Sequence, residues 1–198
     1  AWIGSGDVAH EKIWFDIADQ YGATEFLGYK THTAEGVIQA LVKDGNCVSQ
    51  IKAGDKAQIV VNQTPFYAES GGQVGDTGTI ISTHGATFKV CDTHKNQGHI
   101  ISHIGFLETG TLNVGDEVKL MVDAVRRRAL RAHHSVTHLL HAALRDLLGE
   151  TVVQKGSLVA PDKLRFDFSF NRALSPYELK TIEDNVNARI RHNSVVTT

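Results

Sequence analysis

The chain has 198 residues, 41% of them hydrophobic and 21% charged, and its formal net charge is −2. This composition supports a packed core and excludes wholesale disorder and nucleic-acid binding by bulk charge, although a local basic patch is still compatible with it. No apolar run reaches the roughly 18–20 residues that span a bilayer, and no signal-peptide pattern is recognisable. The two cysteines, Cys47 and Cys91, suit a reducing compartment. We therefore expect a cytoplasmic protein that binds neither membrane nor DNA.

The first half of the sequence predicts a helix followed by a β-barrel. Asp7–Tyr21 places its apolar residues on one broad side, and Gly22 follows as a left-handed cap. Short β-rich runs separated by Gly, Asn and Asp turns then fill residues 26–123. Because no long helix intervenes, these runs indicate an antiparallel sheet, closed so that few edges are exposed. The expected strands are Gly36–Val42, Ala57–Val61, Thr79–Ser82, Thr87–Cys91, Ile100–Phe106 and Glu117–Val122.

After Asp123 the pattern changes to that of an α+β unit. Ala124–Leu148 lacks Gly and Pro and is rich in Leu, Ala and Arg, so we expect a helix, with a break near His133. Val152–Val159 and Leu164–Ser169 predict a hairpin whose second strand alternates apolar and polar side chains. A capping box at Ser175-Pro176-Tyr177-Glu178 begins a last helix. Its expected apolar stripe consists of Leu179, Ile182, Val186 and Ile190.

The predicted fold class is therefore α+β, in three parts. Residues 1–25 form a helical lead-in, residues 26–123 a β-barrel unit and residues 124–198 an α+β core. The sequence starts at Ala1 without a methionine and stops at Thr198 directly after a helical pattern. We expect both ends to be cuts in a longer chain, and the core to be incomplete at its C-terminus.

Histidines cluster in the long predicted helix. His134 and His138 are four residues apart, which places two imidazoles on one face about 6 Å apart along the axis and suits two ligands of one Zn²⁺ ion. A metalloprotease would need glutamate after the first histidine, but Ser135 stands there. His141 lies roughly 10 Å from His134 along the axis, too far to share that ion. The helix thus offers two ligands, unless these histidines are ordinary surface or core residues.

Two further zinc ligands would have to come from elsewhere. Downstream of His141 the sequence offers only His192 and no cysteine. Upstream, Cys91 and His94 form a candidate pair whose spacing is common by chance. We therefore expect the two helical histidines alone to hold zinc weakly.

Three motifs resemble the editing region of the alanyl-tRNA synthetase family, in the same order and spacing. Thr64–Gly78, which reads TPFYAESGGQVGDTG, resembles the glycine motif of that family. His134–His141, which reads HSVTHLLH, resembles its zinc-binding helix. Gln154–Val159 and Leu164–Ser169 resemble the strand pair that follows that helix. The resemblance covers essentially the whole chain.

This resemblance implies a proofreading unit that hydrolyses the ester between tRNA(Ala) and a wrongly attached serine or glycine. The implied fold joins a β-barrel to an α+β two-layer core shared with threonyl-tRNA synthetase editing domains. The implied partners are the acceptor end of tRNA(Ala) and the rest of the synthetase in cis, whose aminoacylation domain, absent from this sequence, would use ATP and Mg²⁺. The implied cofactor is Zn²⁺, held by His134, by His138 and by a later Cys-x₃-His pair without a counterpart here.

Cleavage of an aminoacyl ester needs a well-placed water, donors for the developing oxyanion and a pocket for the terminal adenosine. Gln154 is expected near the histidine helix, where its amide would orient water or substrate. Thr137 is expected to line the pocket, or else to bond the preceding helical turn. Gly71 and Gly72 would let the backbone approach ribose or phosphate, with Gln73 beside them, or would simply form a hairpin turn.

Charged residues near the helix are candidates for substrate contacts. The basic run at residues 126–131 would contact phosphates, or would be a solvated helix face. From it we select Arg126 and Arg131, and we add Arg165 of the hairpin. Asp167 would support a metal-bound histidine, or would be an exposed strand residue.

Three classes of function fit the sequence. The first is an editing deacylase, and the second is a tRNA-binding module without chemistry in this piece of chain. The third is a hydrolase of the peptide-release type, because Gly71-Gly72-Gln73 is also the tripeptide of a release-factor catalytic loop. The β-rich setting and the nearby acidic residues Glu69 and Asp76 argue against the third class.

Overall fold

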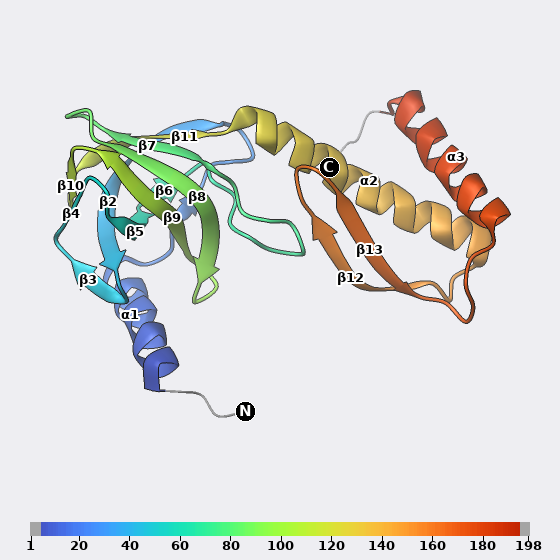
Figure 1. Ribbon diagram of the computed structural model, residues 1–198, viewed down its shortest axis with the longest axis horizontal. Helices are drawn as coiled ribbons and strands as arrows, with labels where there is room; N and C mark the ends of the chain where they lie inside the picture. Colours follow the sequence, from blue (N-terminus) through green and yellow to red (C-terminus); the bar gives the residue numbers. More distant parts are fainter. Residues whose placement is uncertain (1–4, 195–198) are drawn as a thin grey trace. The chain divides into compact units, whose positions relative to one another are not determined.

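A computed structural model describes residues 5–194, with side chains described from residue 12 onward (Figure 1). The chain divides into two compact units. The first comprises the chain up to Ser70 together with Val74–Arg127, and the second comprises Gly71–Gln73 and the chain from Arg128 onward. The lead-in that we set apart at residues 1–25 thus belongs to the first unit, and three residues of the glycine motif belong to the second.

The first unit contains helix α1 (Ser5–Tyr21) and strands β1 (Glu25–Phe26), β2 (Thr33–Lys43), β3 (Asn46–Val48), β4 (Gln50–Lys52), β5 (Lys56–Val61), β6 (Gln63–Thr64), β7 (Gly78–Ser82), β8 (Thr87–Asn96), β9 (Ile100–Thr109), β10 (Thr111–Asn113) and β11 (Glu117–Val122). Helix α2 (Ala124–Leu148) begins in the first unit and continues in the second. The second unit also holds β12 (Val153–Val159), β13 (Leu164–Ser169) and α3 (Pro176–His192). None of the described helices is long and apolar enough to cross a membrane.

Six strands of the first unit close into an antiparallel barrel, which confirms the predicted barrel. They follow the order β11-β7-β8-β9-β5-β2, and the pairing of β11 with β2 completes the ring. All six predicted strands are present, although β8 continues past the expected end at Cys91 as far as Asn96. Closure gives each of these strands a hydrogen-bonded neighbour on both sides, so the ring has no open edge.

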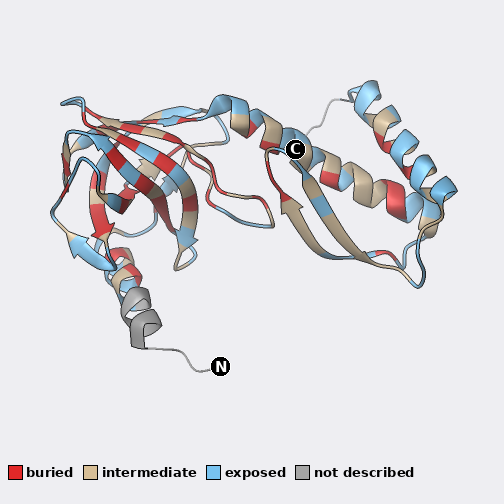
Figure 2. Ribbon diagram, viewed as in Figure 1, coloured by how far each residue is buried: buried red, intermediate tan, exposed pale blue. Residues whose placement is uncertain are grey.

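The barrel interior is a closed apolar core (Figure 2). Phe66 and Phe88 are fully buried in it, and β11 alternates so that Val118, Leu120 and Val122 are buried while their neighbours are exposed. Each fully buried side chain of this size contributes about 1.5–3 kcal/mol relative to its exposed state. The strict alternation of β11 is why its bounds were predicted without error.

Helix α1 packs on the outside of the barrel. Trp14 and Ile17 are buried against Ala40, Val60 and neighbouring residues of the sheet. The helix ends where predicted, because the φ of Gly22 is +71° and its N–H donates to Ala18 O at 2.9 Å.

Helix α2 runs unbroken from Ala124 to Leu148, so the predicted break near His133 is wrong. Asp123 stabilises its first turn, since Oδ1 of that residue accepts from the backbone N–H of Arg126 at 2.9 Å. No Gly or Pro interrupts the helix, and adjacent histidines do not prevent helical geometry.

The hairpin β12–β13 and helix α3 complete the second unit. The strands pair antiparallel with a bulge between Gln154 and Gly156. Helix α3 begins at the predicted capping box, in which Ser175 Oγ accepts from Glu178 N–H at 3.2 Å and the Glu178 carboxylate accepts from Ser175 N–H at 2.8 Å.

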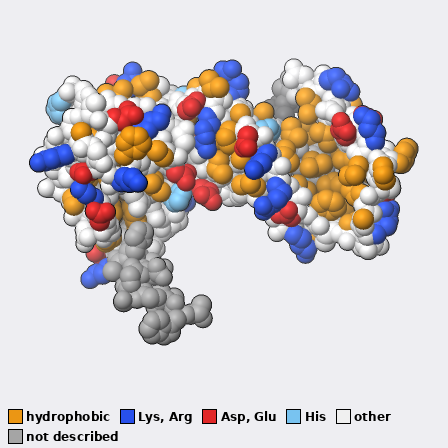
Figure 3. Space-filling model, in the orientation of Figure 1, with side chains coloured by type: hydrophobic (Ala, Val, Ile, Leu, Met, Phe, Trp, Pro, Cys, Tyr) orange, Lys and Arg blue, Asp and Glu red, His pale blue; other side chains and the backbone are white. Residues whose placement is uncertain are grey.

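Only the middle of the predicted apolar stripe of α3 is buried. Ile182 and Val186 are buried, but Leu179 is 55% and Ile190 45% exposed. Hydrophobic side chains gather over β12, β13 and α3 on the face seen in Figure 3, and a shallow pocket of about 310 Å³ lies among them. Its apolar lining consists of Val136, Leu140, Leu164, Leu179, Ile182 and Val186. The second unit therefore leaves part of its apolar surface uncovered.

Five short strands, β1, β3, β4, β6 and β10, were not predicted. Each has only two or three residues, which is too short for a hydrophobic period to be recognised. They flank the barrel: β4 pairs with β10, and β1 runs parallel to β6.

A fully buried histidine lies inside the barrel. Nδ1 of His103 donates to Ile59 O at 2.9 Å, and its Nε2 lies 2.7 Å from Thr64 Oγ1. Because the carbonyl only accepts, Nε2 is the acceptor and the Thr64 hydroxyl donates to it. Thr64 Oγ1 in turn accepts from Phe66 N–H at 3.1 Å. All polar atoms of the imidazole are thus satisfied while it is neutral.

Acid is expected to destabilise the barrel through His103. Burial lowers the pKa of His103 to about 4, whereas an exposed histidine titrates at 6.5. Between these pH values the unfolded chain binds a proton that the folded chain does not, so the free energy of unfolding decreases as the pH falls. The contribution is fully present above pH 6.5 and amounts to about 3 kcal/mol, lost by about pH 4. Urea denaturation followed by tryptophan fluorescence at several pH values measures it.

The control for this experiment is His103→Gln. Glutamine places polar atoms where the imidazole stood but cannot take up a proton. We expect this variant to be less stable at neutral pH and to show a flatter dependence of stability on pH between 6.5 and 4. Equal slopes in the two proteins would contradict the assignment to His103.

Candidate functional site

Two histidines of α2 lie together on one helical face, as predicted. The rings of His134 and His138 are stacked, with centroids 5.2 Å apart and planes inclined by 29°. His134 is partly buried, whereas His138 is exposed. His141 packs instead against Phe166 of β13, with ring centroids 5.2 Å apart. The helix therefore presents His134 and His138 as two adjacent imidazoles, whereas His141 faces the hairpin.

The buried amide of Gln73 contacts the first of these imidazoles. Oε1 of Gln73 lies 2.7 Å from Nδ1 of His134, and Gln73 is only 6% exposed. An amide oxygen only accepts, so Nδ1 of His134 carries the proton and donates it to this bond. The lone pair of the ring then stands on Nε2.

Gln73 reaches His134 because the glycine motif pairs with β12. Val159 N–H donates to Gly72 O at 2.7 Å, and Gln73 forms a parallel bridge with Val159. The φ of Gly72 is +83°, and a Cβ there would lie 2.5 Å from Ser157 O. Only glycine fits such an approach. The close approach expected of Gly72 is thus made to the protein's own strand, whereas contacts of Gly71 and Gly72 with ribose or phosphate stay a prediction.

The electrostatic setting favours a neutral His134. Burial, and after it the charge of the neighbouring His138, lowers the pKa of His134 below its ordinary value. A metal binds the neutral imidazole, because the ligand nitrogen must be free of its proton.

The donor set fits half of a zinc site. Neutral imidazoles whose second nitrogen is hydrogen-bonded are typical zinc ligands, and His134 has this arrangement. Within residues 12–194, the one group of three or more clustered metal-binding side chains is Glu69, Asp92 and His94. That group does not include His134 or His138, so these two would hold Zn²⁺ only with further donors.

Cys91 and His94, the candidate pair whose spacing is common by chance, are not grouped together in the structure. Nε2 of His94 lies 2.9 Å from an Asp92 carboxylate oxygen and 3.6 Å from one of Glu69, whereas Cys91 is exposed and outside this group. Residues three apart on a strand leave opposite faces, which separates the cysteine from the histidine.

Gln154 and Thr137 were the predicted catalytic residues. Gln154 is exposed and lies opposite Phe168 in the hairpin register, so both side chains leave the same face. Phe168 packs against the apolar cluster that includes Ala143 and Leu144 of α2, and that face is therefore the one turned to the histidine helix. Thr137 is buried, and its hydroxyl donates to His133 O at 2.9 Å, which is the local bond weighed as its alternative.

The arginines selected for substrate contacts differ in their surroundings. Arg126 is partly buried and donates from Nη1 to Gly75 O at 2.7 Å. Arg131 is exposed. Arg165 is exposed and donates from Nε to Asp167 at 3.1 Å. Asp167 therefore pairs with an arginine of its own strand, and its support of a metal-bound histidine stays a prediction.

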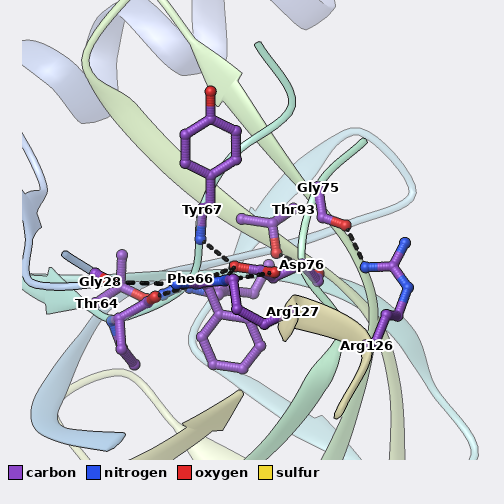
Figure 4. A network of polar contacts seen from close by, with 11 residues as sticks. Gly28, Thr64, Phe66, Tyr67, Gly75, Asp76, Thr93, Arg126 and Arg127 are labelled. Carbon is purple, nitrogen blue, oxygen red and sulfur yellow. Dashed lines mark hydrogen bonds and ion pairs between the residues drawn. The ribbon is translucent and has the colours of Figure 1, made fainter. Parts of the chain in front are cut away.

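The neighbouring Arg127 forms a buried network that the sequence analysis did not single out (Figure 4). Its Nε donates to both carboxylate oxygens of Asp76, at 2.9 and 2.8 Å, and Nη2 forms the ion pair. Nη1 donates to Gly28 O at 3.1 Å and Nη2 to Pro65 O at 2.7 Å, and Tyr67 N–H donates to Asp76 at 2.7 Å. Both charges are almost fully buried and paired.

A second anchor is His133, which sequence reasoning also left without a role. Its Nδ1 donates to Ala160 O at 2.7 Å, at the end of β12. The two neighbouring histidines thus have different partners: His133 donates a hydrogen bond to the hairpin, and His134 donates one to the glycine motif. Nothing in the local sequence distinguishes the two, since each contact joins residues far apart in the chain.

Comparisons with known proteins point to a single family. The profile of the class II tRNA synthetases (A) matches residues 5–126. The alanine–tRNA ligases of Bradyrhizobium diazoefficiens, Rhodopseudomonas palustris and Rhizobium johnstonii are 52%, 54% and 55% identical to this chain over 198, 198 and 197 residues. Each match covers 100% of this chain and 22% of the relative, so the chain spans about a fifth of their length.

Breaking the buried network should destabilise the first unit strongly. Asp76→Asn removes the negative charge and leaves the Arg127 guanidinium buried without a counter-charge, which typically costs about 3–5 kcal/mol. Asp167→Asn is the matched control, because it breaks an exposed pair worth about 0–1 kcal/mol. Urea denaturation of the two variants and the wild type gives both values. Equal losses in the two variants would contradict the central role of Asp76.

Proposed function

Since the chain belongs to the class II alanyl-tRNA synthetases, we propose that it is the editing part of such an enzyme. Its substrate is tRNA(Ala) that carries serine or glycine in error, and its reaction is hydrolysis of the aminoacyl ester. The observation that carries this proposal is the stacked pair His134 and His138, with His134 held by a buried amide. The threonyl-tRNA synthetase editing fold, the acceptor end of tRNA(Ala) as the bound part and a cytoplasmic location belong to the same proposal.

In the proposed reaction the oxygen of a water molecule bonds to the ester carbonyl carbon. The bond from that carbon to the ribose oxygen breaks, and a proton passes from the water to the ribose oxygen. The products are the free amino acid and uncharged tRNA. The protein must position the water, donate hydrogen bonds to the carbonyl oxygen as it gains charge, and hold the terminal nucleotide.

His134 and His138 would hold Zn²⁺ together with two donors from the rest of the synthetase. Bound there, the ion would supply a Lewis acid or a ligand for the amino group of the substrate. Gln154 is exposed on the hairpin face turned to α2, where its amide orients the water or the amino acid. We leave Thr137 out of this machinery, because its buried hydroxyl is bonded to His133 O.

The substrate would be held by backbone and cationic groups. Gly71 is exposed, and no heavy atom lies within 4 Å of where a Cβ would stand, so its backbone is open to a ribose. Arg131 and Arg165 are exposed cations for phosphates, and their contribution would fall with salt. ATP and Mg²⁺ would act only in the aminoacylation part of the synthetase.

A tRNA-binding module without chemistry is the second candidate. It is favoured by one observation: within the described residues, His134 and His138 are not part of any group of three or more clustered metal-binding side chains. A release-type hydrolase is not proposed, because the amide of Gln73 is buried and engaged by His134 rather than free for an ester.

The decisive residue for the editing proposal is Gln154. In the complete synthetase, Gln154→Ala should slow hydrolysis of Ser-tRNA(Ala) on the order of 100-fold, as for the loss of one transition-state hydrogen bond. Attachment of alanine should change little, because Gln154 is exposed and its loss leaves the fold intact. Single-turnover deacylation and aminoacylation rates measure the two effects.

The control is Gln20→Ala, which removes an exposed glutamine of α1. It should leave both rates unchanged. A Gln154→Ala enzyme that deacylates Ser-tRNA(Ala) at the wild-type rate would refute the role of Gln154, and wild-type binding of tRNA(Ala) without deacylation would favour the second candidate.

A further inference from the structure

We propose that Gln73 is a positioning residue for the metal ligand His134. Its Oε1 fixes the imidazole in the tautomer with the proton on Nδ1, so that Nε2 is the nitrogen presented as a ligand. The part of this inference that concerns zinc rests on the proposed function. The part that concerns the tautomer of His134 depends on the protein alone.

The geometry of the contact supports one direction of donation. The Oε1–Nδ1 distance is 2.7 Å, and Gln73 is buried, so water does not replace the amide. A histidine in water favours the opposite tautomer, with the proton on Nε2 and the lone pair on Nδ1. A short bond to a buried acceptor reverses that preference, because a lone pair on Nδ1 would face the lone pairs of Oε1.

The orientation of the ring decides whether the two histidines can act together. His134 and His138 stack at 5.2 Å, so both rings project from the same face of α2. With Nδ1 of His134 engaged by Gln73, only Nε2 remains to bind an ion beside His138. Metal-bound imidazoles typically donate their other N–H to such an outer partner, whose loss costs roughly 10–100-fold in metal affinity.

Gln73 is itself held rigidly, which a positioning residue requires. The backbone bond from Val159 N–H to Gly72 O and the bridge between Gln73 and Val159 fix it on β12. Gly72 permits this approach, since any side chain would meet Ser157 O. Gly72 therefore allows the close approach to β12 that places the Gln73 amide beside His134.

The tautomer can be measured without metal. In this chain, with histidines labelled by ¹⁵N, protonated and unprotonated ring nitrogens resonate in separate ranges, and we expect Nδ1 of His134 to be the protonated one at mildly alkaline pH. Gln73→Met keeps length and burial but removes the acceptor oxygen, so the population should move toward Nε2–H. Gln73→Glu retains an acceptor at the same length and should restore Nδ1–H. Gln63→Met, which removes an amide bonded to Glu35 O in the barrel, should change nothing at His134.

A zinc titration followed on the same resonances tests the second claim. Wild type and Gln73→Glu should bind Zn²⁺ at His134 and His138 with similar affinity, and Gln73→Met roughly 10–100-fold more weakly. A wild-type Nε2–H tautomer, or a Gln73→Met protein with unchanged tautomer and affinity, would overturn the inference. If wild type shows the Nδ1–H tautomer but the complete synthetase, with its further donors, binds no zinc at these histidines, the positioning by Gln73 stands and the metal of the proposed function fails.

Discussion

The buried ion pair of Arg127 and Asp76 is the interaction on which the first unit depends. A guanidinium and a carboxylate removed from water are tolerated only when every donor and acceptor is satisfied. Here the guanidinium also donates to Gly28 O and Pro65 O, and the carboxylate also accepts from Tyr67 N–H. One pair thereby joins the chain after β1, the start of the glycine motif and the first turn of α2. Gly28 and Pro65 lie outside the strands, so the guanidinium satisfies two backbone carbonyls that no sheet pairing satisfies.

The middle of the loop between Tyr67 and Asp76 holds His134 in place within the second unit. Tyr67 and Asp76 are bonded to each other twice, since Asp76 N–H also donates to Tyr67 O at 2.9 Å. The residues between them form a loop with a closed base, and the middle of this loop pairs with Val159. A segment already paired with Val159 loses little further entropy when Gln73 bonds His134. This is the physical reason that a loop, rather than a helix or strand, supplies the partner of the imidazole.

The sequence predicts a feature when the residues that determine it are close together in the chain, and fails when they are far apart. The strict alternation of β11, the capping box at Ser175 and the two ends of α2 are set by local sequence, and they were predicted correctly, whereas the break expected inside α2 was not found. The bond between Gln73 and His134 joins residues 61 apart, and no local pattern contains it. Arg127 belongs to the basic run at residues 126–131, and both interpretations of that run, phosphate contacts and a solvated helix face, would leave its side chain exposed. Arg127 precedes the buried residues Leu130 and Thr137 by three and ten positions, so helical periodicity places all three on the same face of α2. That periodicity predicts a buried Arg127.

The helix sets a limit on what the histidines can do alone. With one turn between them, His134 and His138 stack, and the next histidine on that side, His141, turns to Phe166 with its Nε2 buried and without a hydrogen-bond partner within the described residues. A tetrahedral ion held by this pair needs two donors from other segments of chain. Such donors would link those segments to α2 and its hairpin, so the free energy of metal binding would become part of the free energy that folds this unit. The uncovered apolar surface around Leu164 and Leu179 would act in the same way. A further segment of chain that covered this surface would contribute to the folding free energy of the second unit, together with the metal site.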